Sequence, residues 1–173
     1  MTRMVSTLGT VSLAANYVAV TAEQICYMPA YGIASASTAL VSQNVGAGQW
    51  KKAKSFGKLT GWISVALTAV LAAAMFIWSD ALGSAFSSDP QVARLSGQML
   101  RIVSVAEPLF SMSTVMSGAL RGAGEAKYPF YVGVVCMLCI RVSLGALMLF
   151  GIGMGLSALW IAMAVDMNLR GIA

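Results

Sequence analysis

Four ionisable side chains lie inside long apolar stretches of this sequence: Glu23, Glu107, Arg141 and Asp166. A charged residue at the centre of a membrane helix costs about 2.5–3.5 kcal/mol on insertion scales, so such residues usually face a cavity or an opposite charge. A carboxyl group kept from water favours its neutral form, and it can then bind and release a proton. We therefore predict that Glu23, Glu107 and Asp166 bind a cation or a proton. Arg141 either supports them or forms an ion pair that locks two helices together.

Prolines accompany two of these acids. Pro108 follows Glu107 directly, and Pro29 lies six residues after Glu23. Proline removes a backbone N–H donor and kinks or breaks a helix. Because broken helices at membrane depth commonly line a substrate or ion pathway, we expect both helices to be interrupted near the acids.

Aromatic residues near the acids are candidates for the lining of a substrate cavity. They are Tyr27, Tyr31 and Phe110. Tyr27 lies one helical turn after Glu23 and should share its face. A carboxylate beside aromatic faces suits an organic cation, so a small organic cation is the predicted substrate. The sequence equally allows ordinary apolar packing or an aromatic belt at the membrane surface.

The composition indicates the elements that must position these residues. The 173 residues are 58% hydrophobic and 10% charged, whereas soluble domains carry about 25% charged residues. A helix of about 20 apolar residues crosses ~30 Å of hydrocarbon. We predict an all-α, polytopic transmembrane helix bundle, one domain over residues 1–173, with residues 1–10 as the tail of a further helix. The five predicted spans are residues 13–43, 57–79, 90–119, 129–150 and 155–173.

Two Gly-Ala-Gly segments, Gly46-Ala47-Gly48 and Gly122-Ala123-Gly124, each lie beside basic residues. Glycine adopts the left-handed conformation that ends a helix at little cost, so both segments are predicted to end helices. The GxxxG spacing from Gly118 to Gly122 also permits close helix approach. Cytoplasmic loops are enriched in Lys and Arg. The loops near residues 46–58 and 120–128 are therefore predicted to be cytoplasmic, in the inner or plasma membrane.

The sequence gives little support to an enzyme, a metalloprotein or a nucleic-acid-binding protein. The chain has no His and no P-loop or dinucleotide-binding motif, so we predict no enzyme activity and no catalytic residue. Cys136 and Cys139 have CxxC spacing, but a zinc site needs further ligands, so these thiols and Cys26 are predicted to pack in the core. No metal or cofactor is expected beyond a coupling ion, H⁺ or Na⁺. The net charge of +5 indicates membrane orientation and lipid contact rather than a nucleic-acid partner.

Five features follow one another along the chain: "AANYVAVTAEQICYMPAYGIASASTALVSQNVGAG", "FSSDPQV", "SGALRGAGEAKYP", the intramembrane Arg141 and "GLSALWIAMAVDMNLRG". In this order they resemble the second half of multidrug and toxic compound extrusion (MATE) transporters. The resemblance implies twelve helices in two lobes that export organic cations, drugs and other xenobiotics in exchange for protons or sodium. It matches the five predicted spans to helices eight to twelve. An N-terminal lobe or a second half is therefore an expected partner.

The resemblance favours proton coupling over sodium coupling. Some sodium-coupled members carry an acid about two turns before the G-x-L-R-G segment. Phe110 stands at roughly that place here, and Glu107 lies one turn earlier.

Two alternative functions stay open. One is a lipid-linked oligosaccharide flippase of the same superfamily, whose cavity would need more basic residues than Arg141 and Arg101. The other is a non-transporting half-transporter or truncated membrane protein, because alternating access needs two lobes.

Overall fold

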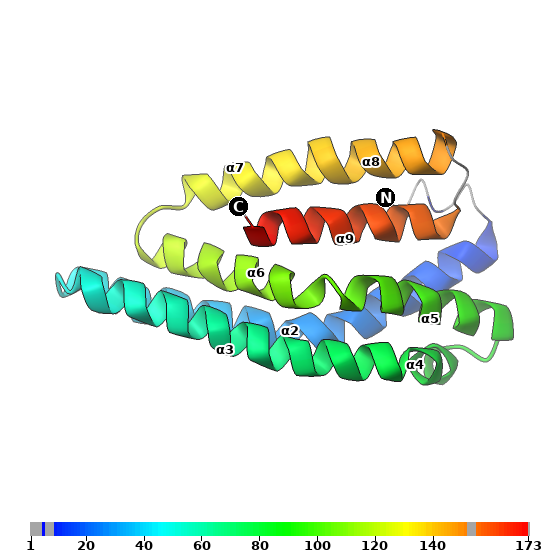
Figure 1. Cartoon of the computed structure of the whole chain (residues 1–173), viewed down its shortest axis with the longest axis horizontal. Helices are drawn as coiled ribbons and strands as arrows, with labels where there is room; N and C mark the ends of the chain where they lie inside the picture. Colours follow the sequence, from blue (N-terminus) through cyan, green and yellow to red (C-terminus); the bar gives the residue numbers. More distant parts are fainter. Residues whose placement is uncertain (1–4, 6–8, 152–154, 173) are drawn as a thin grey trace.

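The fold is helical throughout its described part. A computed structural model describes Val5, residues 9–151 and residues 155–172, and every element in these ranges is a helix (Figure 1). The predicted all-α fold class is confirmed. The helices are α2 (Thr10–Gly46), α3 (Trp50–Ile77), α4 (Ser79–Phe86), α5 (Pro90–Ser104), α6 (Glu107–Gly122), α7 (Lys127–Val135), the π-helix η1 (Cys136–Val142), α8 (Ser143–Ala146), the π-helix η2 (Leu147–Gly151) and α9 (Leu156–Ile172).

The helices pack in two connected groups. α2, α3 and α6 pack against one another, and α4 packs against α5. α9 lies between the α5–α6 pair and the rod formed by α7, η1, α8 and η2 (Figure 1). The largest apolar core includes Met99, Leu100 and Leu159, from α5 and α9. At its edge, Trp160 Nε1 donates a hydrogen bond to Asn16 Oδ1 over 3.1 Å, so α9 is also tied to α2.

Several helices are suited to a membrane. Two described helices are long and apolar enough to cross one, Trp50–Ile77 and the rod from Lys127 to Leu149. α5 and α6 add a third if they form one span, because they pass the same test together across a bend of 57°. The boundaries of the five predicted spans stay predictions.

The basic segment after the first Gly-Ala-Gly is helical. α3 begins at Trp50, so Lys51, Lys52, Lys54 and Lys58 lie on its first three turns. The expected loop over these lysines is wrong. Lys favours helices, and its long side chain can reach water from a helix that also packs an apolar face.

α2 does not break at its proline. The helix runs from Thr10 to Gly46 with Pro29 inside it, so the break expected there is wrong, and a kink at Pro29 stays a prediction. Proline costs this helix one backbone hydrogen bond. Buried side chains on both sides of the proline, from Ala15 to Val41, pack α2 against its neighbours. We infer that this packing outweighs the local preference of proline.

Both Gly-Ala-Gly segments end helices, as predicted. α2 ends at Gly46 and α6 ends at Gly122. Gly48 has φ of +71° and Gly124 has φ of +91°. These angles lie in the left-handed region, where a side chain would be strained.

α2 and α6 approach closely at the GxxxG segment. The Thr38 hydroxyl donates to the backbone carbonyl oxygen of Gly118, at 2.9 Å. A Cβ atom on Gly118 would lie 2.6 Å from the Ala34 carbonyl oxygen, and one on Gly122 would lie 2.5 Å from the Thr38 carbonyl oxygen. The predicted close approach of helices is confirmed here, and it depends on the missing side chains.

Gly118→Ala is therefore expected to lower the free energy of unfolding by about 1–3 kcal/mol, the usual cost of overpacking. Thermal unfolding in detergent measures the change. Gly32→Ala is the matched control within α2, because a Cβ atom at Gly32 meets nothing within 4 Å. Equal destabilisation by the two substitutions would contradict this account of the contact.

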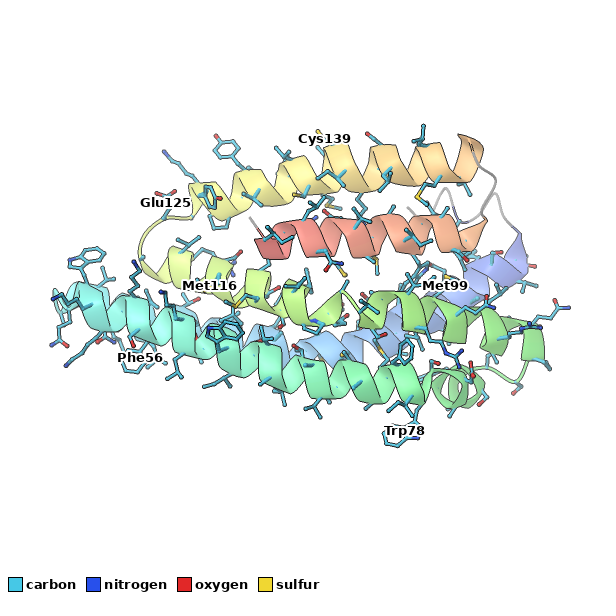
Figure 2. All side chains as sticks on the ribbon, viewed as in Figure 1. Phe56, Trp78, Met99, Met116, Glu125 and Cys139 are labelled. Carbon is cyan, nitrogen blue, oxygen red and sulfur yellow. The ribbon has the colours of Figure 1, made fainter. Side chains whose placement is uncertain are left out.

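The three cysteines do not all pack in the core. Cys26 and Cys136 are buried, as predicted, but Cys139 is exposed. Figure 2 shows Cys139 on the outer side of the rod, away from α9. The prediction for Cys139 is wrong because hydrophobicity alone does not distinguish the core-facing side of a membrane helix from its outer side.

Candidate transport site

Glu107 lies at a break between two helices. α5 ends at Ser104 and α6 begins at Glu107, with a bend of 57° between them. Pro108 has no N–H to donate to the carbonyl of Ser104, four residues earlier, so a continuous helix would lose that bond. The Ala106 N–H instead donates to the Val103 carbonyl oxygen over 2.8 Å. The predicted helix interruption beside this acid is confirmed.

The Glu107 carboxyl group is fully buried. Neither of its oxygens has a hydrogen-bond partner among the residues that the structure describes. An unsatisfied buried polar group costs about 1–3 kcal/mol, and a charged one costs more. The native fold keeps this acid in a position where a proton or a bound cation would remove that cost.

Glu23 belongs to the same buried region. Its side chain on α2 is 3% exposed, and it interacts electrostatically with Glu107 and with Arg141. Cys26, one turn along α2, interacts with both acids. The α2–α6 packing therefore brings together two acids that are 84 residues apart in the sequence.

The three predicted aromatic residues also come together. The Tyr27 ring meets the Tyr31 ring edge to face, with centroids 5.5 Å apart. It meets the Phe110 ring in the same manner at 6.3 Å. Tyr27 is one turn from Glu23, and Phe110 is one turn from Glu107, so the aromatic cluster lies directly next to the acids.

A cavity of about 380 Å³ opens beside this cluster, between α2, α6, α7 and α9. Tyr31 and Phe110 line it, but the carboxyl groups of Glu23 and Glu107 do not. Its charged lining residues are Arg121 and Arg170. Hydroxyl groups of α6 also line it. The cavity thus has aromatic and basic walls, and Glu107 lies one helical turn from the Phe110 ring that lines it.

Asp166 is held by two arginines. Arg170 Nε and Nη2 bind the Asp166 carboxylate oxygens at 3.0 and 2.8 Å. Arg141 Nη1 lies 3.9 Å from Oδ2 of the same carboxylate. Asp166 is 1% exposed. This cluster links η1 to α9 and carries one more positive charge than negative charge.

A line of hydroxyl groups joins the helices on the other side of Glu107. Thr60 donates to Ser37 over 2.9 Å, and Thr68 donates to Ser111 over 2.8 Å. Ser111 in turn donates to the carbonyl oxygen of Pro108 over 2.8 Å. The first bond joins α3 to α2, and the second joins α3 to α6 one turn after the acid.

Sequence reasoning missed the roles of Arg170 and Arg121. The spacing of four residues between Asp166 and Arg170 on one predicted helix was a usable signal for their ion pair. Arg121 carried no such signal, because its place in the cavity depends on how α6, α7 and α9 pack. The π-helix that carries Arg141 was also missed, although π-helical turns are frequent at functional sites.

Apolar helices, a helix broken at a buried acid and a cavity near that break are typical of membrane transport proteins. A family model described as MatE matches residues 1–147. This chain belongs to the MatE family, whose members are transporters in membranes.

Similar proteins cover nearly the whole chain. A probable multidrug resistance protein NorM from Thermotoga maritima is 28% identical over 164 residues, which are 94% of this chain and 35% of the relative. Multidrug and toxin extrusion protein 1 from Oryctolagus cuniculus is 26% identical over 158 residues, 91% of this chain and 28% of the relative. The chain thus spans about a third of the length of these curated relatives.

Solved structures share the fold. A MOP superfamily transporter from Pyrococcus furiosus superposes with a TM-score of 0.92 and 19% identity, covering 99% of this chain and 38% of that one. An inward-facing MATE family transporter superposes with a TM-score of 0.84 and 16% identity, covering 93% and 37%. The fold of this chain is that of about one lobe of such a transporter.

Proposed function

We propose that this chain forms one lobe of a secondary transporter that exports small organic cations and other xenobiotics in exchange for protons. The observation that carries the proposal is the Glu107 carboxyl group, which is fully buried at a helix break without a hydrogen-bond partner in the described part of the chain. Its neighbour Glu23 supplies a second acid. The rings of Tyr27, Tyr31 and Phe110 supply faces that attract an organic cation.

The two acids would couple the gradient to export. When both are ionised, their combined negative charge holds a cation beside the aromatic rings. A proton that enters from the other side of the membrane neutralises one acid and releases the cation. The α5–α6 break allows the two helices to reorient as this charge changes. Asp166 was predicted as a third coupling acid, and its two arginines favour a supporting role in holding η1 to α9.

The membrane arrangement completes the proposal. The C-terminal ends of α2 and α6 and the N-terminal ends of α3 and α7 lie at one end of the bundle (Figure 1). The basic segments at 46–58 and 120–128 therefore share a side, which we assign to the cytoplasm of an inner or plasma membrane. Alternating access needs a second lobe to rock against this one, so a partner lobe is part of the working transporter.

A second candidate function is favoured by the basic cavity. Arg121 and Arg170 line it and no carboxylate does, so this cavity suits the phosphate groups of a lipid-linked oligosaccharide better than a cation. A flippase of the same superfamily would use that cavity and would not need the acids for coupling.

Glu23→Gln is expected to uncouple transport. In inside-out vesicles that contain the two-lobe transporter with this chain, an outward-directed H⁺ gradient, with the lumen acidic, should drive uptake of ethidium in exchange for protons. The variant keeps the shape of the side chain but cannot ionise, so gradient-driven uptake should fall to the level of protein-free vesicles. Unchanged uptake in Glu23→Gln would remove this residue from the mechanism.

The same vesicles separate the two candidate functions. The exporter moves ethidium and responds to Glu23→Gln. The flippase moves a fluorescent polyprenyl diphosphate sugar, is indifferent to the pH gradient and ignores Glu23→Gln.

A further inference from the structure

An apolar groove of about 400 Å³ lies far from the acids, where the ends of α2 and α6 meet the start of α3. Val41 and Val45 of α2 form one wall, and Met116 and Leu120 of α6 form another. The third wall is the first two turns of α3, beginning at Trp50. The groove is therefore apolar along its length and is built from three helices at the same end of the bundle (Figure 1).

Two lysines form the rim of this groove. Lys54 and Lys58 both line it, and both side chains are exposed. Their spacing of four residues places them on one face of α3. Over residues 41–58 and 116–127 the chain has six basic side chains and a single acidic one, Glu125. The rim is thus complementary to an anionic group.

The position of Trp50 indicates the depth of the groove. Trp50 is 62% exposed and lines the groove at the first residue of α3. Trp side chains concentrate at the level of lipid headgroups, where one edge of the ring is apolar and the other meets water. Lys54 and Lys58 lie one and two turns further along α3, on either side of Gly57, and their long side chains can extend back to headgroup level.

We propose that this groove binds one anionic phospholipid. One acyl chain lies along the deeper walls formed by Val41, Gly57 and Met116, and the ammonium groups of Lys54 and Lys58 bind the phosphate at headgroup level. Each basic residue near a membrane surface adds attraction for anionic lipid, so two lysines should give a preference on the order of tenfold over a zwitterionic lipid. This site uses none of the residues of the proposed transport mechanism, so its test does not depend on whether that mechanism is correct.

Quenching of Trp50 fluorescence tests the proposal. The purified protein is placed in phosphatidylcholine vesicles that contain increasing fractions of either dibrominated phosphatidylglycerol or dibrominated phosphatidylcholine. Subtracting the signal of Trp50→Phe isolates Trp50 from Trp62, Trp78 and Trp160. We expect half-maximal quenching of Trp50 at about tenfold lower fraction of the brominated anionic lipid.

Charge-matched variants identify the rim. In Lys54→Gln/Lys58→Gln the two brominated lipids should quench Trp50 at similar fractions. Lys51→Gln/Lys52→Gln removes the same charge from the same end of α3, but neither residue lines the groove. This control should keep most of the preference.

Three results would overturn the proposal. They are equal quenching by both lipids in the wild type, an equal loss of preference in the two double variants, and no quenching by either lipid, which would mean that protein covers the groove. If the Lys54/Lys58 variant does not fold, the salt dependence of the wild type provides the test. Raising the salt concentration from about 0.1 M to 1 M should abolish the preference for anionic lipid. An unchanged preference at high salt also overturns the proposal.

Discussion

Glu107→Gln is expected to remove gradient-driven accumulation of substrate almost completely. A gradient of two pH units stores about 2.7 kcal/mol per proton, enough for about 100-fold accumulation by a one-proton exchanger. The Glu107 carboxyl group is fully buried beside Glu23, and a glutamine there cannot exchange a proton. Accumulation of ethidium in vesicles should therefore fall from up to about 100-fold to about onefold.

Two variants control this experiment. Glu107→Asp keeps an ionisable group and should retain part of the gradient-driven accumulation. Glu125→Gln removes an acid whose Oε1 accepts a hydrogen bond from the Tyr128 N–H at the start of α7, and it should leave accumulation unchanged. If Glu107→Gln still accumulates ethidium as the wild type does, Glu107 is not a coupling residue. If exchange without a gradient is lost as well, the acid binds substrate besides coupling.

Asp166→Asn is expected to lower the free energy of unfolding by about 3–5 kcal/mol, or roughly 10 °C in unfolding temperature. Asp166 is 1% exposed, and its partners Arg170 and Arg141 are only 20% and 24% exposed. Removing the carboxylate takes away the group to which both Arg170 hydrogen bonds run, and it removes one of the opposite charges near Arg141. Breaking a buried ion pair in this way costs much more than the ion pair contributes.

An exposed ion pair provides the matched control for this substitution. Arg101 binds Asp80 over 2.6 Å, but the two side chains are 46% and 71% exposed. Asp80→Asn should therefore change the stability by about 1 kcal/mol or less. Unfolding temperatures measured in one detergent compare the two variants directly. A similar shift for both would mean that water reaches Asp166 as easily as it reaches Asp80.

Local chemistry explains which parts of the fold were predictable. The break at Glu107 follows from the missing N–H of Pro108, and the helix ends at Gly48 and Gly124 follow from glycine's freedom at positive φ. Pro29 shows the limit of this reasoning. The same missing N–H is tolerated inside α2, because tertiary packing holds the helix on both sides of it.

The structure brings the three predicted aromatic residues together, and their roles in a site stay predictions. The meeting of Tyr27 with Phe110 was expected from their common proximity to buried acids. The basic wall was not, because Arg121 and Arg170 are 49 residues apart and meet only through the packing of α6 and α9. A single sequence indicates which residues are costly in a membrane, but it does not indicate which helix faces each one.

The glycine contact between α2 and α6 determines where this lobe can bend. With Gly118 and Gly122 pressed against the backbone of α2, α6 cannot slide or roll without a collision. We therefore expect any change in the angle between α5 and α6 to occur at the short link between them, residues 105–106. Glu107 is the first residue beyond it, so in the proposed mechanism protonation of this acid would act directly at the hinge between α5 and α6.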